Sequence, residues 1–152
     1  MLRFVFGNTH GNFRIVDRKK DLVKLQHGEY ISYGKIESIL KTNPIVDNIC
    51  VYADPYQDFC LAIVIPSVVE LASLSSLPAK DAIKEQAVIE HVASTVAKYG
   101  LKMGLEKFEC PKKVLLTLDE WTPDNGLVTA SFKLRRRFIE KRYEAELAFL
   151  FT

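Results

Sequence analysis

The chain has few of the residues that build disulfide frameworks, and it has no apolar run long enough to cross a membrane. Its 152 residues include three cysteines, Cys50, Cys60 and Cys110, and no C-x-x-C pair. An odd number of cysteines, two of them inside apolar runs, indicates reduced core thiols in an intracellular, cytoplasmic protein. The longest apolar run, Phe59 to Ile65, is far shorter than the ~20 residues of a transmembrane helix, so we expect no direct membrane insertion.

A strong charge of one sign is also absent. The net charge of +2 is too small to indicate a nucleic-acid or membrane partner. His10, His27 and His91 do not have the spacing of metal ligands and no acidic cluster accompanies them, so we predict no metal site. The sequence has no G-x-x-x-x-G-K-[ST] phosphate loop, no internal repeat and no low-complexity tract. With 48% hydrophobic and 26% charged residues, the composition is that of an ordinary globular domain.

Short β-prone runs and helical patterns alternate irregularly along the chain, which predicts an α+β fold. The expected class is a small mixed sheet with packed helices and an N-terminal hairpin. The expected strands are 3–6 and 12–16 (the hairpin), 45–52 and 59–65 (joined by a turn), and 113–118. The expected helices are 32–43 (capped by Ser32), 68–74, 79–99 (with Ile89, Val92, Val96 and Tyr99 buried) and 134–149.

The first basic cluster lies near the front of the chain, where Arg18, Lys19, Lys20 and Lys24 put four cations within seven residues. Composition alone favours a solvated, charged turn. The alternative is a phosphate-facing hinge, in which Arg18 forks onto phosphate or ribose oxygens and Lys24 supplies a point charge. Gly28, which has no Cβ, would let the backbone approach a ligand closely.

The second basic cluster begins at Lys133 and continues through Arg135, Arg136 and Arg137. A glycine- and threonine-containing turn precedes Lys133, a setting that suits a lysine presented to an anion. A solvated helix start and a nucleic-acid patch are the two alternatives, and a basic run alone separates them poorly. No aromatic residues of the kind that stack bases are interleaved with these cations, and we interpret Trp121 as a packing anchor.

Both clusters lie in segments that resemble a known family. Asp17-Arg-Lys-Lys-Asp-Leu-Val-Lys-Leu-Gln-His-Gly-Glu-Tyr-Ile-Ser-Tyr-Gly-Lys-Ile-Glu37 resembles the signature that opens the C-terminal domain of acyl-CoA synthetases, which belong to the adenylate-forming (AMP-binding) superfamily. Trp121-Thr-Pro-Asp-Asn-Gly-Leu-Val-Thr129 and Phe132-Lys-Leu-Arg-Arg136 are similar to eukaryotic long-chain fatty-acid CoA ligases. The resemblance runs from about Gly11 to Phe149, nearly the whole chain.

The resemblance implies a role for each candidate site residue. Lys133 would be the lysine that bridges the ATP α-phosphate and the acyl carboxylate, where negative charge builds up during adenylation. Arg18 would contact the nucleotide, and Lys20 would be the hinge about which the domain rotates between the two half-reactions. Gly28 would line the pantetheine tunnel in the thioester-forming conformation, with Lys24 near the adenylate in that state.

Two further positions of the resemblance bear on local structure. Glu37 matches an acidic position that we interpret as structural, paired with a nearby cation. Shorter members of the family have glycine directly before the catalytic lysine, whereas Phe132 precedes it in this chain, as in the long-chain subgroup.

The implied reaction of the complete enzyme converts a fatty acid, ATP and CoA into acyl-CoA, AMP and pyrophosphate. Mg²⁺ would accompany ATP and would not be bound by this chain. The partner would be the N-terminal AMP-binding domain of the same enzyme, which carries the phosphate loop and acyl tunnel that this sequence does not contain. We therefore expect residues 17–152 to form the C-terminal lid domain, residues 1–16 to form a hairpin and junction, and the chain to be inactive alone.

Two other functions compete with this one. A stand-alone binding or regulatory module would keep the fold without the chemistry. A basic nucleic-acid-binding domain would show binding that weakens steeply with salt. Full-length relatives often associate with membranes through parts that this sequence does not contain.

Overall fold

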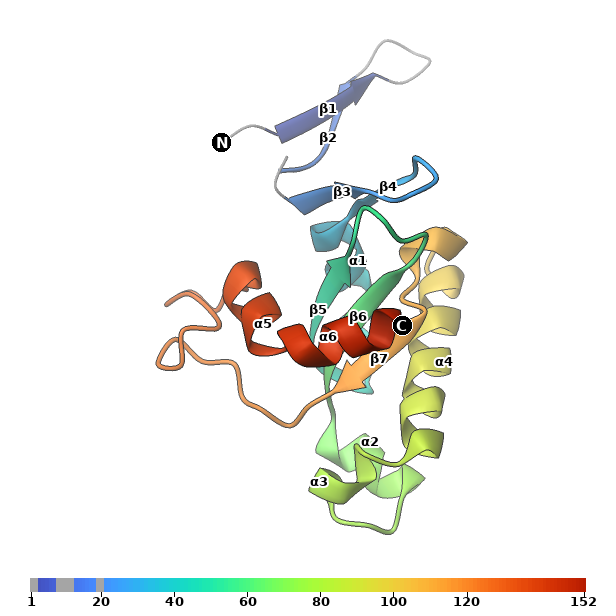
Figure 1. Ribbon diagram of the computed structural model, residues 1–152, viewed down its shortest axis with the longest axis vertical. Coiled ribbons are helices and arrows are strands. Elements are labelled where there is room, and N and C mark those ends of the chain that lie inside the picture. The colour runs from blue at the N-terminus through green and yellow to red at the C-terminus, as the bar shows by residue number, and fades with distance from the viewer. Residues whose placement is uncertain (1–2, 8–12, 19–20) are drawn as a thin grey trace.

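The computed structural model describes residues 3–7, 13–18 and 21–152, with side chains from residue 21 onward (Figure 1). Within this part the fold is α+β, which confirms the predicted class. The strands are β1 (Arg3–Gly7), β2 (Phe13–Arg18), β3 (Leu22–Lys24), β4 (Tyr30–Ser32), β5 (Val46–Ala53), β6 (Cys60–Pro66) and β7 (Lys113–Leu116). The helices are α1 (Tyr33–Leu40), α2 (Val68–Leu74), α3 (Ala79–Ala82), α4 (Gln86–Lys102), the short 3₁₀ helix η2 (Lys107–Glu109), α5 (Arg136–Arg142) and α6 (Glu144–Phe151).

The strands form two antiparallel hairpins and one mixed sheet. β1 pairs with β2, and β3 pairs with β4, both antiparallel. In the third sheet β6 is central, antiparallel to β5 and parallel to β7. The two hairpins predicted from the sequence, at the N-terminus and between 45 and 65, are confirmed.

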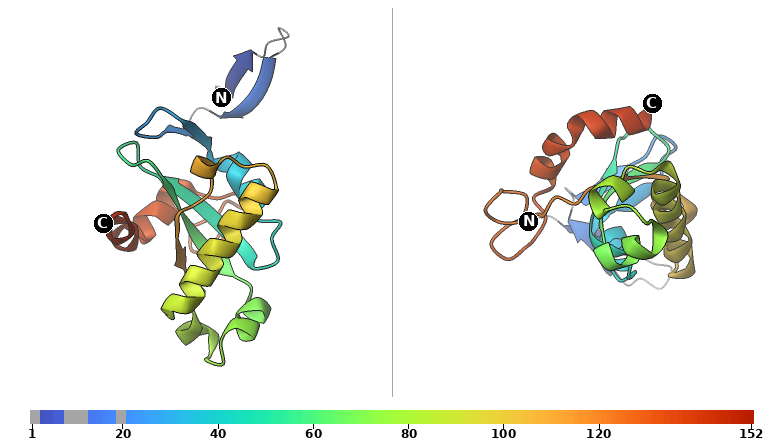
Figure 2. Two further views of the ribbon diagram at one scale, coloured as in Figure 1. Left: turned by 90° about the vertical axis from the view of Figure 1, so that its right-hand side faces the viewer. Right: turned by 90° about the horizontal axis from the view of Figure 1, so that it is seen from below.

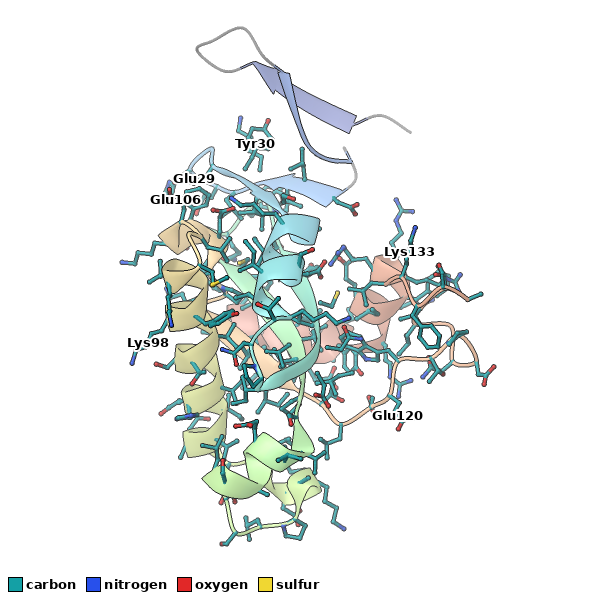
Figure 3. The ribbon with its side chains drawn as sticks, turned by 180° about the vertical axis from the view of Figure 1, so that it is seen from behind. Glu29, Tyr30, Lys98, Glu106, Glu120 and Lys133 are labelled. Carbon is teal, nitrogen blue, oxygen red and sulfur yellow. The ribbon has the colours of Figure 1, made fainter. Side chains whose placement is uncertain are left out.

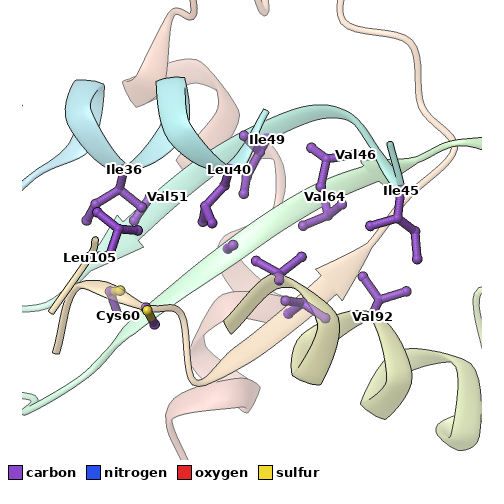
Figure 4. Close-up of a cluster of buried hydrophobic side chains, with 14 of the residues drawn as sticks. Ile36, Leu40, Ile45, Val46, Ile49, Val51, Cys60, Val64, Val92 and Leu105 are labelled. Carbon is purple, nitrogen blue, oxygen red and sulfur yellow. The ribbon is translucent and has the colours of Figure 1, made fainter. Parts of the chain in front are cut away.

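The mixed sheet divides the core into two apolar clusters because side chains alternate along a strand. On β6, Ala62 and Val64 face the first cluster, whereas Leu61 and Ile63 face the second. Helices α1 and α4 cover the first face, and α5 and α6 cover the second (Figure 2). Figure 4 shows the first cluster, where β5 and β6 meet residues of α1 and α4.

Two long helices predicted from the sequence are each broken in the structure. The expected helix over 79–99 is divided into α3 and α4. Between them, the N–H groups of Lys84 and Glu85 bond to the third residue back instead of the fourth. The buried stripe of α4 is Val88, Val92, Val96 and Gly100, which confirms Val92 and Val96. The other two predicted residues, Ile89 and Tyr99, are half-buried. The expected helix over 134–149 is interrupted at Tyr143, whose hydroxyl accepts a hydrogen bond from the indole of Trp121 (3.2 Å).

The free edge of the sheet, along β5, is closed by side chains. The Val51 N–H donates to Glu37 Oε2 (2.8 Å), and the Val51 carbonyl accepts from Arg136 Nη1 (2.8 Å). Two residues further on, the Ala53 N–H donates to the hydroxyl of Tyr33 (3.2 Å). An edge strand exposes unpaired backbone groups, and at Val51 and Ala53 side chains of the domain satisfy them.

Glu37 and Arg136 also bind each other, so that α1, β5 and α5 meet at one point. Arg136 donates from Nη2 to Glu37 Oε1 (2.6 Å) and from Nη1 to Glu37 Oε2 (3.0 Å). Their side chains are only 17% and 11% exposed, and the guanidinium lies 4.1 Å from the centroid of the Tyr33 ring. Burial raises the pKa of Glu37, and the guanidinium and the Val51 N–H oppose that shift. The predicted pairing of Glu37 with a cation is therefore confirmed.

We predict that Arg136→Ala lowers the free energy of unfolding by about 3–5 kcal/mol, because it leaves a buried carboxylate and a strand carbonyl without their cation. Arg137→Ala, at the exposed neighbouring position, is the control and should change stability by less than ~0.5 kcal/mol. Urea unfolding followed by the fluorescence of Trp121, the only tryptophan, measures both. Equal stability of the two variants would contradict the prediction.

Candidate functional site

Lys133 lies on a tight hairpin formed by residues 127–135, called here the Lys133 hairpin. Val128 and Leu134 form a β-bridge, and the Arg135 N–H donates to the Leu127 carbonyl (2.9 Å). At the tip, the Thr129 N–H donates to the Lys133 carbonyl (2.8 Å). Lys133 thus directly follows a three-residue turn, residues 130–132, and pairs with Thr129 across it.

The turn requires an unusual backbone conformation at the residue before the lysine. The Phe132 N–H donates to the Thr129 carbonyl (2.8 Å), and the Lys133 N–H donates to Thr129 Oγ1 (3.1 Å). Phe132 has φ 61°, in the left-handed region. This is the last position of a type I turn with a bulge, where glycine is favoured, and a side chain there costs about 1–2 kcal/mol.

The side chain of Lys133 is exposed and extends away from the body of the domain (Figure 3). Across residues 21–152, where side chains are described, no carboxylate forms an ion pair with it. Its ammonium group is therefore available to an anion from outside the domain.

Both ends of the Lys133 hairpin are fixed. Arg136, three residues after the lysine, is bonded to Glu37 and to the edge of β5 as described above. Arg135 donates from Nη1 to the Gly126 carbonyl (3.1 Å), and its guanidinium lies 3.8 Å from the centroid of the Phe138 ring. Sequence reasoning did not separate Arg136 from the arginines on either side. The acidic position Glu37, which needed a cation, was the only signal that could have found it.

A second tight turn brings together Lys24 and Gly28. The Leu25 N–H donates to the Glu29 carbonyl (2.8 Å), and the Gly28 N–H donates to the Leu25 carbonyl (3.0 Å). Gly28 has φ 96°, so this β3–β4 turn has the same bonding as the Lys133 hairpin, with glycine at the left-handed position. A Cβ on Gly28 would come no nearer than 4.0 Å, to Lys24 Cε, so the need for glycine is conformational.

The structure does not bring all the predicted site residues together. Lys133 lies on one side of the domain, and the β3–β4 turn, marked by Glu29 and Tyr30, lies on the other (Figure 3). Lys24 is exposed, with its ammonium 5.9 Å from the centroid of the Tyr30 ring. Arg18 is described only as the last residue of β2, and Lys20 lies outside the described residues. Lys24 and Lys133, one cation of each basic cluster, therefore lie apart, and the roles of Arg18 and Lys20 stay predictions.

A groove of about 1010 Å³ runs beside the Lys133 hairpin, between it and the α1–β5 edge. The groove is lined by more basic than acidic residues. The acidic residues are Asp21, Glu37 and Glu140. The cations are Lys41, Lys133, Arg135, Arg136 and Arg137. This surface suits an anionic ligand or an acidic partner surface. Among the described residues there is no cluster of three metal-ligating side chains, and no helix is long and apolar enough to span a membrane.

Comparison with known proteins supports the resemblance. The family described as AMP-binding enzyme C-terminal domain matches residues 35–123, more than half of the chain. In the solved A-PCP didomain of a carboxylic acid reductase from Segniliparus rugosus, in complex with AMP, one part superimposes with a TM-score of 0.82. It is 28% identical, and the match covers 97% of this chain and 20% of that one. Arg18, Lys24, Gly28 and Lys133 lie outside the matched family range, so their roles are proposals.

Curated relatives give the same assignment. Long chain acyl-CoA synthetase 8 of Arabidopsis thaliana is 40% identical over 96% of this chain, and Long-chain-fatty-acid–CoA ligase 4 of Saccharomyces cerevisiae is 39% identical over 85%. The chain spans about a fifth of the length of these relatives (21% and 20%). The chain belongs to the AMP-binding enzyme C-terminal domain family, and its curated relatives are long-chain acyl-CoA synthetases.

Proposed function

We propose that this chain is the C-terminal domain of a long-chain acyl-CoA synthetase and supplies its adenylation lysine, Lys133. The complete enzyme converts a fatty acid, ATP and CoA into acyl-CoA, AMP and pyrophosphate. The observation that carries the proposal is an exposed lysine, without an ion-pair partner in residues 21–152, on a hairpin fixed to the sheet. The names of the relatives support the choice of substrate class.

Adenylation gives Lys133 a defined task. The fatty-acid carboxylate attacks the α-phosphorus of ATP, pyrophosphate leaves, and negative charge concentrates on the oxygens of that phosphorus. A preorganised cation stabilises this charge more in the transition state than in the substrates. Lys133 fits because its backbone is held on both sides while its ammonium group faces outward. Mg²⁺ enters with ATP, and this chain contributes none of its ligands.

The second half-reaction uses the other side of the domain. Gly28 lines the path of the pantetheine arm of CoA, Lys24 lies near the adenylate, and Arg18 contacts the nucleotide. Because Lys133 and the β3–β4 turn lie on different sides, they take turns at one active site only if the domain rotates between steps. Lys20, between β2 and β3, is the proposed hinge.

The proposed partner is the N-terminal AMP-binding domain of the same enzyme, located in the cytoplasm. The chain spans only about a fifth of its relatives, which supports a larger partner region that holds the substrates. Residues 17–152 are the C-terminal domain in this proposal, and residues 1–16 are the hairpin and junction. A stand-alone regulatory module is not favoured.

The test compares the chain alone with the chain joined to the N-terminal domain of a long-chain acyl-CoA synthetase. Supplied with ATP, Mg²⁺, palmitate and CoA, the chain alone should form no acyl-CoA, and the joined protein should form it. A joined protein that folds but does not release pyrophosphate would count against the proposal.

We predict that Lys133→Ala in the joined protein slows adenylation by roughly 10²–10³, because one transition-state charge contact is lost. Thioester formation from supplied acyl-adenylate should be unchanged. The control is Lys141→Ala, an exposed lysine of α5 away from the Lys133 hairpin, which should leave both rates unchanged. Equal loss of both half-reactions in Lys133→Ala would exclude the assigned role.

We predict that Lys20→Pro impairs thioester formation more than adenylation, because proline restricts the backbone rotation that the hinge needs. The two half-reactions are measured separately, as pyrophosphate release and as acyl-CoA formed from supplied acyl-adenylate. Lys20→Ala, which removes the charge and keeps backbone freedom, is the control. Unchanged thioester formation in Lys20→Pro would refute the hinge.

A further inference from the structure

Phe132 combines two features that are unfavourable for an isolated domain. Its backbone has φ 61°, which a side chain rarely adopts, and its side chain is 68% exposed. Within residues 21–152 no aromatic ring and no cation packs against its ring. The strain is therefore not offset by burial or by a ring contact inside the described part of the chain.

The fold itself does not require an aromatic residue there. The β3–β4 turn has the same bonding pattern and carries glycine, Gly28, at the equivalent position with φ 96°. Glycine or asparagine at position 132 would allow the same turn with less strain. Residues in sparsely populated backbone conformations occur where a function depends on them.

The position of Phe132 indicates what that function is. It directly precedes Lys133, on a hairpin fixed through Arg136 to Glu37 and β5. A large apolar ring on a rigid support, exposed beside a lysine that must reach substrates held elsewhere, is suited to insertion into an apolar pocket of a partner. The long part of the relatives that this chain does not span provides such a partner.

We propose that Phe132 is a positioning residue whose ring seats the Lys133 hairpin in an apolar pocket of the N-terminal domain during adenylation. This inference rests on the proposed function and deepens it. The ring contacts the partner domain and not the reacting atoms, so it determines where the ammonium of Lys133 comes to rest. The contact exists only in the conformation that brings Lys133 to the substrates, so thioester formation does not depend on it.

Three substitutions separate the backbone effect from the side-chain effect. Phe132→Asn and Phe132→Gly relieve the strain and remove the apolar ring. Phe132→Leu keeps the strain and an apolar side chain of similar reach. Stability is measured on the 152-residue chain by thermal unfolding, and both half-reactions are measured on the protein joined to the N-terminal domain.

We expect stability and activity to move in opposite directions. Phe132→Asn should raise the melting temperature of the chain by about 2–4 °C, yet slow adenylation about 10-fold, as for loss of a strong interface contact. Phe132→Gly should also slow adenylation. Phe132→Leu should adenylate at a rate within about 3-fold of the parent rate. In all three variants, thioester formation from supplied acyl-adenylate should be unchanged.

Two results would overturn the inference. Adenylation at the parent rate in Phe132→Asn would show that the ring is not used. Equal loss in Phe132→Leu and Phe132→Asn would show that an aromatic ring, and not an apolar contact, is needed. Failure of the proposed function is distinguishable, since it appears as an inactive parent protein or a silent Lys133→Ala substitution.

Discussion

The buried contact of Arg136 with Glu37 and Val51 determines where the Lys133 hairpin lies on the domain. Helix α5 is only seven residues long and its first residue is Arg136, so this contact sets its position on the edge of β5. Replacing a buried ion pair by apolar residues is often neutral or stabilising, so attraction between the charges is not its main contribution. We infer that its main contribution is specificity, because one guanidinium bonds at once to two carboxylate oxygens and to a strand carbonyl. This contact positions Lys133, three residues before.

The architecture could be predicted from the sequence wherever local pattern and burial agree. The β5–β6 hairpin follows from two apolar, β-branched runs joined by a polar turn, and α2 lies over the predicted range 68–74. The break at Tyr143 could not be predicted, because the partners of this residue come from elsewhere in the chain. Near Tyr143 the local sequence is helical, but the chain turns there and the Tyr143 hydroxyl meets both the indole of Trp121 and the carboxylate of Asp119. Those partners come from a segment more than twenty residues away.

The candidate site shows the same limit at the level of single residues. Lys133 and Gly28 stand in recognisable segments, so the sequence could nominate them. Three consecutive arginines, by contrast, look alike in composition, and only the fold distinguishes the buried Arg136 from the exposed Arg135 and Arg137. The left-handed backbone conformation of Phe132 could not be predicted either, because phenylalanine at the end of a turn does not indicate a positive φ.

The two equivalent turns fit the proposal that one small domain takes part in two reaction steps. Each is closed by two backbone hydrogen bonds and a left-handed residue, so each holds its tip in one conformation without help from outside the turn. Catalysis needs that rigidity, because a misplacement of about 1 Å can cost 10²-fold in rate. In the proposed mechanism the domain rotates, so a rigid tip also needs a contact that ends the rotation where the tip reaches the substrates. At Gly28 the tip has no side chain and the backbone itself can approach a ligand. Phe132, in contrast, is a strained residue with an exposed ring, and such a ring can pack against the partner domain and hold the rotated domain in place.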